Sequence, residues 1–380
     1  MKVNQKLSLI VALLIVIGML AGCATPAATA TTSPTEVQTA APTEEPASST
    51  IVVTDALDRT VEFTELPQRI ILLGKGTTLL ANSAYLFPEA QERIISYELR
   101  LQMKDRNFIQ TIFTSTADMT LLEKDAGAEQ IAPLNPDLVI MKTYMAEKLG
   151  KSIEELGVNV VYLDLETPEK FYQDIRTLGQ IFGNNERAEE IVQLYQGNET
   201  RISDALSGLT DEEKPSVLML QYSNKDDAIT FSIAPIDWLQ TMLVMNAGGD
   251  PVWKDATTDG GWTIVSLEQI AAWNPEMIFV VDYSGKAVDV VAQLKTDPSW
   301  QALAAVKDEK VYAVPVDFLS WDQADSRWGM GELWLASKMH PDKFPAFDML
   351  QELASFYQTY YGLDESVINE KIMPLVSGDL

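Results

Sequence analysis

Cysteine and histidine are almost absent from this chain of 380 residues, which contains one of each. A single cysteine, Cys23, excludes a disulfide within the chain and a cysteine-based metal site. A single histidine, His340, excludes a histidine-rich zinc or manganese site and fits poorly with a nucleophile activated by histidine. We expect His340 on the surface near a helix end. After residue 23, no apolar run is long enough to span a bilayer.

Positive charge is also scarce, with 28 Lys and Arg against 55 Asp and Glu and a net charge of −27. Such an acidic surface argues against binding to nucleic acid. It does not limit the choice of a small ligand, because a cleft can be locally basic on an acidic body. The hydrophobic content of 46% is typical of a globular protein.

The N-terminus has the pattern of an export signal. Lys2 and Lys6 precede an apolar run of about 14 residues, which is short for a membrane span and suits a signal-peptide core. The run ends in Leu20-Ala21-Gly22-Cys23, which resembles a bacterial lipobox. We therefore expect a signal peptide over 1–22, lipidation of Cys23, and an exported protein anchored to the outer face of the cell membrane or to the periplasmic side of the envelope. The alternative is an ordinary signal peptide with a chance cysteine.

Residues 23–50 consist mainly of Ala, Thr, Pro, Ser and Glu. Such a segment cannot bury enough apolar surface to fold and is expected to be a disordered tether. The remaining part of about 330 residues exceeds one small core and suits two lobes.

Strand and helix patterns alternate along the rest of the chain, which favours the α/β class with mostly parallel sheets. A first lobe is expected over 51–166 and a second over 209–380. The expected buried strands are 70–73, 138–141 and 158–163 in the first lobe, and 216–221, 277–281 and 311–314 in the second.

Between the lobes, residues 167–208 have helical spacing. Thr167-Pro168-Glu169 has the features of a helix start, with a capping hydroxyl, a proline and an acid in the first turn. Gly183-Asn184-Asn185 interrupts the pattern, which then continues. We predict one long and nearly continuous inter-lobe helix over 167–208.

The chain contains an internal repeat. Glu129-Gln130-Ile131 precedes Asn135-Pro136-Asp137 and an apolar strand, and Glu268-Gln269-Ile270 precedes Asn274-Pro275-Glu276 and another. The spacing is the same in both copies, which lie 268 − 129 = 139 positions apart. Two similar lobes with a ligand cleft between them follow from this repeat.

These two units, together with 158–206, Asn246-Ala247-Gly248-Gly249 and 297–328, resemble the helical-backbone binding proteins of ABC importers over roughly residues 51–345. The resemblance implies two Rossmann-like lobes bridged by a single long α-helix, with the ligand cleft between the lobes. It also implies a binding protein rather than an enzyme, with no catalytic residues and no cofactor of its own. Members of the family carry ferric siderophores, haem, cobalamin and, in some cases, molybdate or tungstate.

The resemblance further implies one exposed glutamate in each lobe that docks on arginines of the permease dimer, and Glu129 and Glu268 match these positions. The alternative is that both are acids that stabilise a helix N-terminus, and Ser266 with Gln269 resembles a capping box.

In the first lobe, ligand groups are expected where a strand ends and a helix begins. Lys75, Gly76 and Thr77 occupy such a position, where close backbone and a positive charge suit an anion. The alternative is a plain strand-to-helix turn. Tyr144 follows another strand together with Lys142 and is a weaker candidate. Arg100 lies in a segment, 97–120, that has no counterpart in the resemblance.

In the second lobe, Trp262 matches a position where the family places an aromatic ring against the ligand. Tyr222 follows a strand. Trp321 and Arg327 combine a flat apolar surface with a forked donor. The alternative for this last pair is an aromatic corner of the core with an Arg–Asp ion pair. Trp328 and Trp334 are expected in the core.

The leading expectation is a monomer that captures an iron(III)-siderophore-type chelate and delivers it to an ABC permease, with no metal site of its own. Molybdate or tungstate, or cobalamin or haem, are the alternatives within the same class. Outside that class stand a ligand-sensing lipoprotein and a lipid-anchored hydrolase.

Overall fold

The structure is a computed structural model that describes residues 50–380 except 104–105, 226–227 and 259. The expected signal peptide over 1–22, the lipidation site Cys23 and the tether up to residue 49 lie outside these residues. Within the described part of the chain, no helix combines the length and the apolar character that a membrane span requires. The described residues form one compact unit.

The first lobe contains a small hairpin and a parallel sheet. β1 (Ile51–Thr54) and β2 (Thr60–Phe63) pair antiparallel. The sheet has the order β4-β3-β5-β6 and is parallel throughout. Its strands are β3 (Ile70–Leu72), β4 (Ile94–Tyr97), β5 (Leu138–Lys142) and β6 (Asn159–Leu163), and its helices are α1 (Thr77–Ala84), α2 (Ala90–Arg93), α3 (Phe108–Ile112), α4 (Ala128–Ile131) and α5 (Lys151–Glu154).

The second lobe contains a mixed sheet with the order β10-β8-β7-β11-β12, in which β9 also pairs with β7. Strand β11 pairs parallel with both β7 and β12, whereas β8 pairs antiparallel with both of its neighbours, β7 and β10. The strands are β7 (Ser216–Lys225), β8 (Ala228–Ile233), β9 (Asp250–Pro251), β10 (Thr263–Val265), β11 (Met277–Val281) and β12 (Val311–Ala313). The helices are α8 (Leu239–Asn246), α9 (Leu267–Trp273), α10 (Ala287–Thr296), α11 (Ala304–Lys307) and α12 (Trp328–Met339).

Both copies of the sequence repeat have the same structure. In each copy a helix, α4 or α9, leads through an asparagine with positive φ, Asn135 at 45° or Asn274 at 43°, into a buried parallel strand. The acid after the proline fixes the start of the neighbouring strand: Asp137 accepts a backbone N–H just before β3, and Glu276 accepts one at the first residue of β7. The repeat therefore encodes a strand-pairing unit that each lobe contains once.

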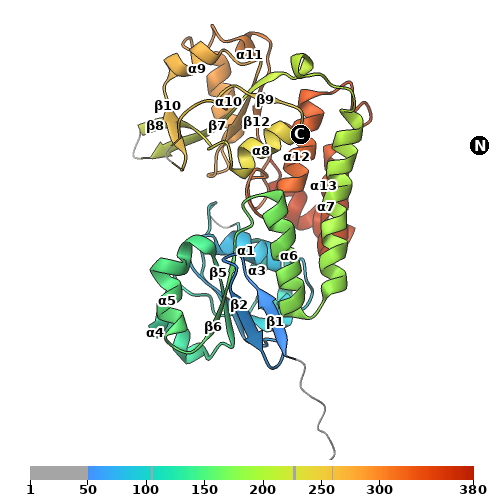
Figure 1. Cartoon of the computed structure of the whole chain (residues 1–380). Coiled ribbons are helices and arrows are strands. Elements are labelled where there is room, and N and C mark those ends of the chain that lie inside the picture. The colour runs from blue at the N-terminus through green and yellow to red at the C-terminus, as the bar shows by residue number, and fades with distance from the viewer. Residues whose placement is uncertain (1–49, 104–105, 226–227, 259) are drawn as a thin grey trace, which may run out of the picture. The chain divides into compact units, whose positions relative to one another are not determined.

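The helical segment between the lobes differs from the prediction in one respect. It consists of two helices, α6 (Pro168–Phe182) and α7 (Asn185–Ala205), which are separated at Gly183. Gly183 has a φ of +68°, and a Cβ at this position would lie 2.6 Å from the Leu66 side chain. The chain reverses there, so that α6 packs against α7, and α7 alone is the long helix that runs from one lobe to the other (Figure 1).

The C-terminal part of the chain reinforces this bridge. Helix α13 (Met349–Tyr361) lies beside α7, where Glu352 forms an ion pair with Arg201 at 2.6 Å. Arg187, at the other end of α7, donates to the backbone carbonyl of Tyr360. Residues 349–361 therefore belong to the bridge between the lobes as well as to the predicted second lobe, 209–380. The short helix α14 (Glu365–Val367) follows.

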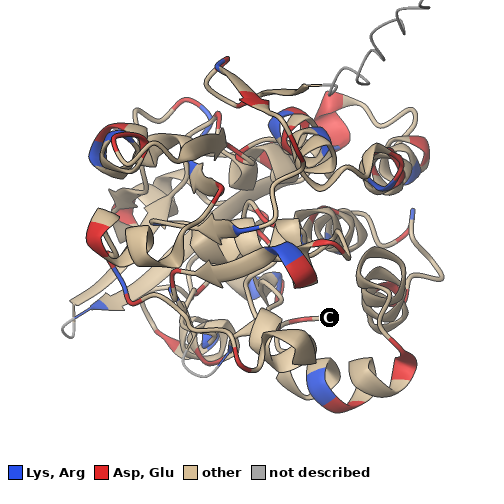
Figure 2. Ribbon diagram, turned by 90° about the horizontal axis from the view of Figure 1, so that it is seen from below, with Lys and Arg blue, Asp and Glu red and all other residues tan. Residues whose placement is uncertain are grey.

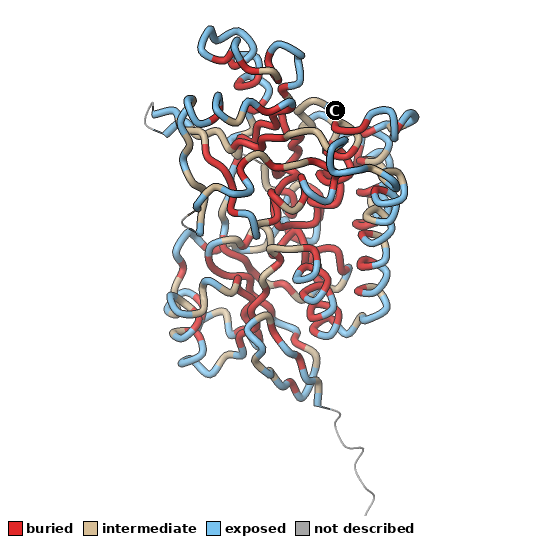
Figure 3. The backbone as a smooth tube through the Cα atoms, turned by 45° about the horizontal axis from the view of Figure 1, so that its top comes forward, coloured by how far each residue is buried: buried red, intermediate tan, exposed pale blue. Residues whose placement is uncertain are grey.

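Charge and burial follow these layers. Asp and Glu are spread over the outer elements with Lys and Arg among them (Figure 2), whereas the central strands β3 and β5 of the first sheet and β11 of the second are fully buried (Figure 3). The expectation of a surface position for His340 is wrong, because its side chain is buried and its Nε2 lies 3.2 Å from the carbonyl oxygen of Gly248. Trp328 and Trp334 are in the core, as predicted.

Glu332 of α12 is an unusual core residue. Its side chain is buried, and neither carboxylate oxygen has a hydrogen bond of normal geometry among the described residues. Burial raises the pKa of Glu332 from 4.5 to about 8, although the Asn246 side chain lowers this pKa to a small extent. As the pH rises, the Glu332 carboxyl therefore loses its proton in the unfolded chain at a lower pH than in the folded protein. Between about pH 4.5 and pH 8, each rise in pH thus lowers the free energy of unfolding.

We predict that Glu332→Gln removes this penalty. At pH 9 the variant should be more stable than the wild type by roughly 1–3 kcal/mol, and at pH 5 the difference should shrink to a few tenths of a kcal/mol. Urea unfolding of both proteins at the two pH values measures this difference. Equal stability of variant and wild type at both pH values would mean that Glu332 finds a polar partner in solution.

Candidate ligand-binding cleft

A cavity of about 610 Å³ lies where the strands of both lobes end. The turns after β3, β5, β6 and β11 contribute Lys75, Tyr144, Glu166 and Tyr283. Ligands of open α/β sheets bind at such carboxyl ends of strands. The other lining residues are Leu79 of the first lobe and Trp238, Gln240, Gly260, Gly261, Trp262, Gln323 and Ala324 of the second.

The wall from the first lobe is built around Tyr144, which donates from its hydroxyl to the carbonyl oxygen of Lys75 at 3.1 Å. The Lys75 ammonium lies 6.0 Å from the centre of the Tyr144 ring. Gly76 makes this packing possible, because its φ is +90° and a Cβ would lie 2.5 Å from the Tyr144 hydroxyl oxygen. Thr77 is buried and donates to the carbonyl oxygen of Gly74, so it shapes the turn and does not line the cavity.

The same wall contains a buried ion pair. The Lys142 side chain is 0% exposed, and its ammonium lies 2.6 Å from Glu166 Oε1. It also donates to the carbonyl oxygen of Asp164. By contrast, within the described residues Lys75 has no carboxylate at ion-pair distance, so it is the uncompensated cation of the cavity wall.

The wall from the second lobe is aromatic. The Trp262 ring meets Trp238 edge to face, with centroids 6.0 Å apart, and meets Tyr283 similarly at 6.2 Å. The Tyr283 hydroxyl donates to Asp322 at 2.9 Å, and Gln240 donates to the Asp322 carbonyl. Burial raises the pKa of Asp322. These contacts hold the three rings together as an aromatic corner of the cleft.

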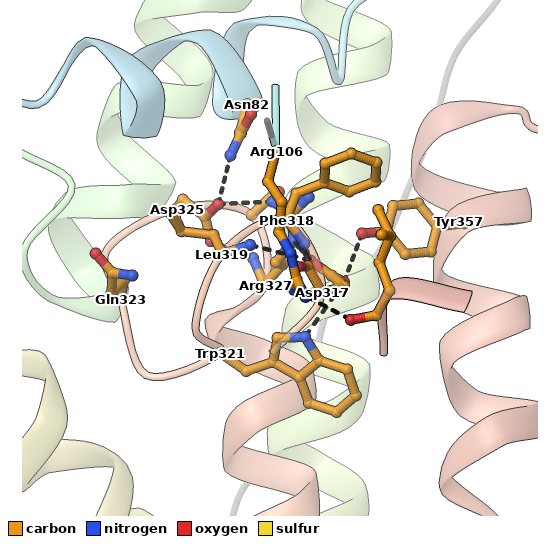
Figure 4. A network of polar contacts seen from close by, with 12 residues as sticks. Asn82, Arg106, Asp317, Phe318, Leu319, Trp321, Gln323, Asp325, Arg327 and Tyr357 are labelled. Carbon is orange, nitrogen blue, oxygen red and sulfur yellow. Dashed lines mark hydrogen bonds and ion pairs between the residues drawn. The ribbon is translucent and has the colours of Figure 1, made fainter. Parts of the chain in front are cut away.

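Trp321 and Arg327, predicted as ligand residues, do not line this cavity. Arg327 is 0% exposed and forms ion pairs with Asp317 at 2.6 Å and Asp325 at 2.7 Å (Figure 4). The buried Trp321 donates from its indole nitrogen to Asp317 at 3.3 Å. The structure thus places both residues in the alternative role, an aromatic corner with Arg–Asp pairs, because buried carboxylates require a buried cation.

This cluster joins the two lobes. Asn82 of α1 donates to Asp325 at 2.8 Å, and Arg106 donates to the carbonyl oxygen of Asp317 (Figure 4). Gln323, on the cavity wall, exchanges two side-chain hydrogen bonds with Gln102 at 2.5 and 2.8 Å. The segment 97–120, which had no role in the sequence analysis, therefore supplies contacts between the lobes. No sequence pattern could indicate these contacts, because the two glutamines lie 221 positions apart.

The other predicted site residues lie elsewhere. Tyr222 lines a separate cavity of about 740 Å³, which shares Tyr283 with the cleft.

Glu129 and Glu268 are exposed on α4 and α9, which belong to different lobes (Figure 1). A backbone N–H and the Ser266 hydroxyl lower the pKa of Glu268. Permease docking by these two acids stays a prediction.

The lining residues that the prediction did not include comprise the polar and aromatic side chains of Glu166, Trp238, Gln240 and Tyr283. The rule that ligands bind after strand ends could have indicated Glu166 and Tyr283, which follow β6 and β11 within a few residues. Trp238 and Gln240 lie at the start of α8, and only the fold brings them to the cleft.

Within the described part of the chain, no group of three His, Cys, Asp or Glu residues is placed to hold a metal ion.

We predict that Arg327→Met destabilises the protein by roughly 3–5 kcal/mol, because it leaves two buried carboxylates without a cation. Arg201→Met, at an exposed ion pair of the bridge, should cost about 1 kcal/mol or less. Urea unfolding measures both variants. If Arg327→Met kept wild-type stability and lost only ligand affinity, the direct binding role would be correct.

The comparisons with known proteins agree with this geometry. Residues 115–317 match the family model described as periplasmic binding protein. The chain is 24% identical to the molybdate-binding protein MolA of Haemophilus influenzae, over 82% of this chain and 90% of the relative. It is 23% identical to the iron-uptake system-binding protein of Bacillus subtilis, over 72% and 81%.

A crystal structure of a periplasmic solute binding protein from Veillonella parvula is similar with a TM-score of 0.68 and 26% identity, over 84% of this chain and 96% of that one. The α/β fold with two lobes agrees with this neighbour. Proteins of the matched family bind small ligands and deliver them to ABC permeases, and they are not enzymes. The chain belongs to the periplasmic binding protein family, as a substrate-binding component of ABC importers.

Proposed function

We propose that this protein captures a bulky metal chelate, of the iron(III)-siderophore type, in the cleft between its lobes and delivers it to an ABC permease. The observation that carries the proposal is the cavity of about 610 Å³, with an aromatic wall on one side and an uncompensated lysine on the other. Ligand pockets of drug-sized molecules have this size and are mostly apolar with a few polar groups.

The composition of the walls favours a chelate over a bare metal ion. Glu166 is the only carboxylate among the described lining residues, and it is already paired with Lys142. A bare divalent cation would need several oxygen, nitrogen or sulfur ligands from the protein. A chelate carries its own ligands to the metal and presents flat, partly apolar surfaces that suit Trp238, Trp262 and Tyr283.

Molybdate or tungstate is a second candidate, which two observations favour. Lys75 lies at the start of α1, where the helix dipole and a free ammonium both attract an anion. The relative from Haemophilus influenzae is a molybdate-binding protein. Cobalamin and haem remain further ligands of the chelate type.

Delivery to the permease would use the two exposed glutamates Glu129 and Glu268, one in each lobe. Two carboxylates on separate lobes can orient the protein on a permease dimer through complementary charge, and they can speed the encounter.

The lipobox at Leu20-Ala21-Gly22-Cys23 supports export and anchoring through a lipid on Cys23.

Thermal unfolding of the purified protein against ferric catecholates, ferric hydroxamates, ferric citrate, haemin, cobalamin, molybdate and tungstate tests the ligand class. A ligand at about 100 times its Kd should add roughly 2.7 kcal/mol of stability, which is a shift of several degrees. We expect a shift with one iron chelate and none with its iron-free form. A shift with molybdate or tungstate alone would establish the second candidate, and no shift with any compound would contradict the proposal.

Two pairs of variants then locate the ligand. Trp262→Ala should weaken binding of a chelate at least tenfold through loss of stacking area, whereas Tyr222→Ala, in the other cavity, should leave it unchanged. For an oxyanion, Lys75→Met should weaken binding while Lys148→Met, an exposed lysine outside the cleft, should not.

We predict that Cys23→Ser abolishes incorporation of labelled fatty acid and moves the protein from the membrane fraction to the soluble fraction of the expressing bacterium. One acyl-modified cysteine is the anchor in this account, and no helix of the described residues can replace it. Retention of the Cys23→Ser protein in the membrane would contradict a lipid anchor at this residue.

A further inference from the structure

The carboxylate of Glu166 stands in the wall of a cleft whose other charged lining residue, among those described, is a lysine. Its side chain is 42% exposed, and it pairs at 2.6 Å with Lys142, which is fully buried. A carboxylate in this position repels any anionic ligand and at the same time cancels the attraction of Lys142. Its presence therefore affects the charge of the ligand that the cleft accepts.

The backbone holds Glu166 at this position. The preceding residue, Leu165, has a φ of +60° and is buried, a conformation that side chains other than glycine rarely adopt. The buried carboxylate of Asp174 in α6 accepts the backbone N–H groups of Asp164 and Leu165, both at 2.7 Å. Such strained backbone persists only where the surroundings fix it, and it is frequent at functional sites.

We propose that Glu166 is the charge-selecting residue of the cleft, because it neutralises Lys142 and leaves Lys75 as the uncompensated cation among the described residues of the cavity wall. This role rests on the proposed function, and it restricts the charge of the ligand that the cleft binds. The cleft favours neutral or weakly anionic ligands and disfavours highly charged ones. Removing the Glu166 charge should make a second cation available to the ligand.

A merely structural role for Glu166, as the partner of a buried lysine, predicts a different result. Loss of the ion pair would then change stability, and it would lower the affinity for neutral and anionic ligands alike. The ratio between the affinities for the two kinds of ligand separates the two roles, because only charge selection changes this ratio.

The experiment measures binding of molybdate, ferric citrate and cobalamin by isothermal titration calorimetry at low and high salt. Glu166→Gln should raise the affinity for the two anions by about fivefold to tenfold, the effect of one unit charge a few ångströms away in a partly exposed site. The affinity for cobalamin should stay within twofold. The gain should diminish at high salt.

Lys142→Met makes the opposite change, because it leaves the Glu166 charge uncompensated, and it should lower the affinity for the anions by a similar factor. Combining Lys142→Met with Glu166→Gln restores the wild-type charge of the wall and should restore the wild-type affinities. If one single variant does not fold, the other still tests the inference. Glu169→Gln, an exposed acid outside the cavity, changes the net charge equally and should alter none of the affinities.

Absent or unchanged binding of both molybdate and ferric citrate in Glu166→Gln, or a change by the same factor for cobalamin, would overturn the inference. The proposed function fails separately: if the wild type binds no compound of the panel but Glu166→Gln gains binding of molybdate or ferric citrate, charge selection holds and the ligand class is wrong.

Discussion

The ion pairs of Arg327 are the interaction on which the geometry of the cleft depends. A guanidinium buried among aromatic rings needs carboxylates beside it, and Asp317 and Asp325 supply them. Asp325 also accepts a hydrogen bond from Asn82 of the opposite lobe. The same cluster therefore fixes the loop that leads to Gln323 and connects that loop to the first lobe. Loss of this cluster would therefore remove one of the contacts that fix the spacing between the aromatic wall and the lysine wall.

The bridge adds a second constraint on the lobes. A continuous helix such as α7 hinges poorly compared with loops, and α13 packs beside it through the ion pair of Arg201 and Glu352. The cleft is thus largely formed before the ligand arrives, which reduces the cost of ordering on binding. Tyr283 and Gln240 illustrate this, because both are held by hydrogen bonds to Asp322, a residue of the protein itself.

Much of the fold could be predicted because local patterns determine it. The buried strands are continuous apolar runs, and the two copies of the repeat place an acid where it fixes the neighbouring strand, as Asp137 and Glu276 do. The break between α6 and α7 depends on two adjacent residues, because Gly183 ends α6 with a positive φ and Asn184 caps α7 by accepting the backbone N–H of Arg187. The sequence shows an interruption there, but it does not show that the chain reverses. In the site, Lys75, Tyr144 and Trp262 follow general rules for strand ends or the family resemblance. Arg327 could not be assigned in this way, because an arginine near acids and aromatic rings has the same local sequence whether it faces a ligand or the core.

The most direct test is a crystal structure of the protein loaded with an iron chelate or an oxyanion, with the metal located by its anomalous scattering. The account predicts a single metal peak between Lys75 and Trp262. It also predicts that the hydrogen bonds of Asn82 with Asp325 and of Gln102 with Gln323 are present in the loaded protein as they are here. A metal peak outside this cavity, or lobes that have separated with loss of these two contacts, would contradict a preformed cleft held by the buried Arg327 cluster.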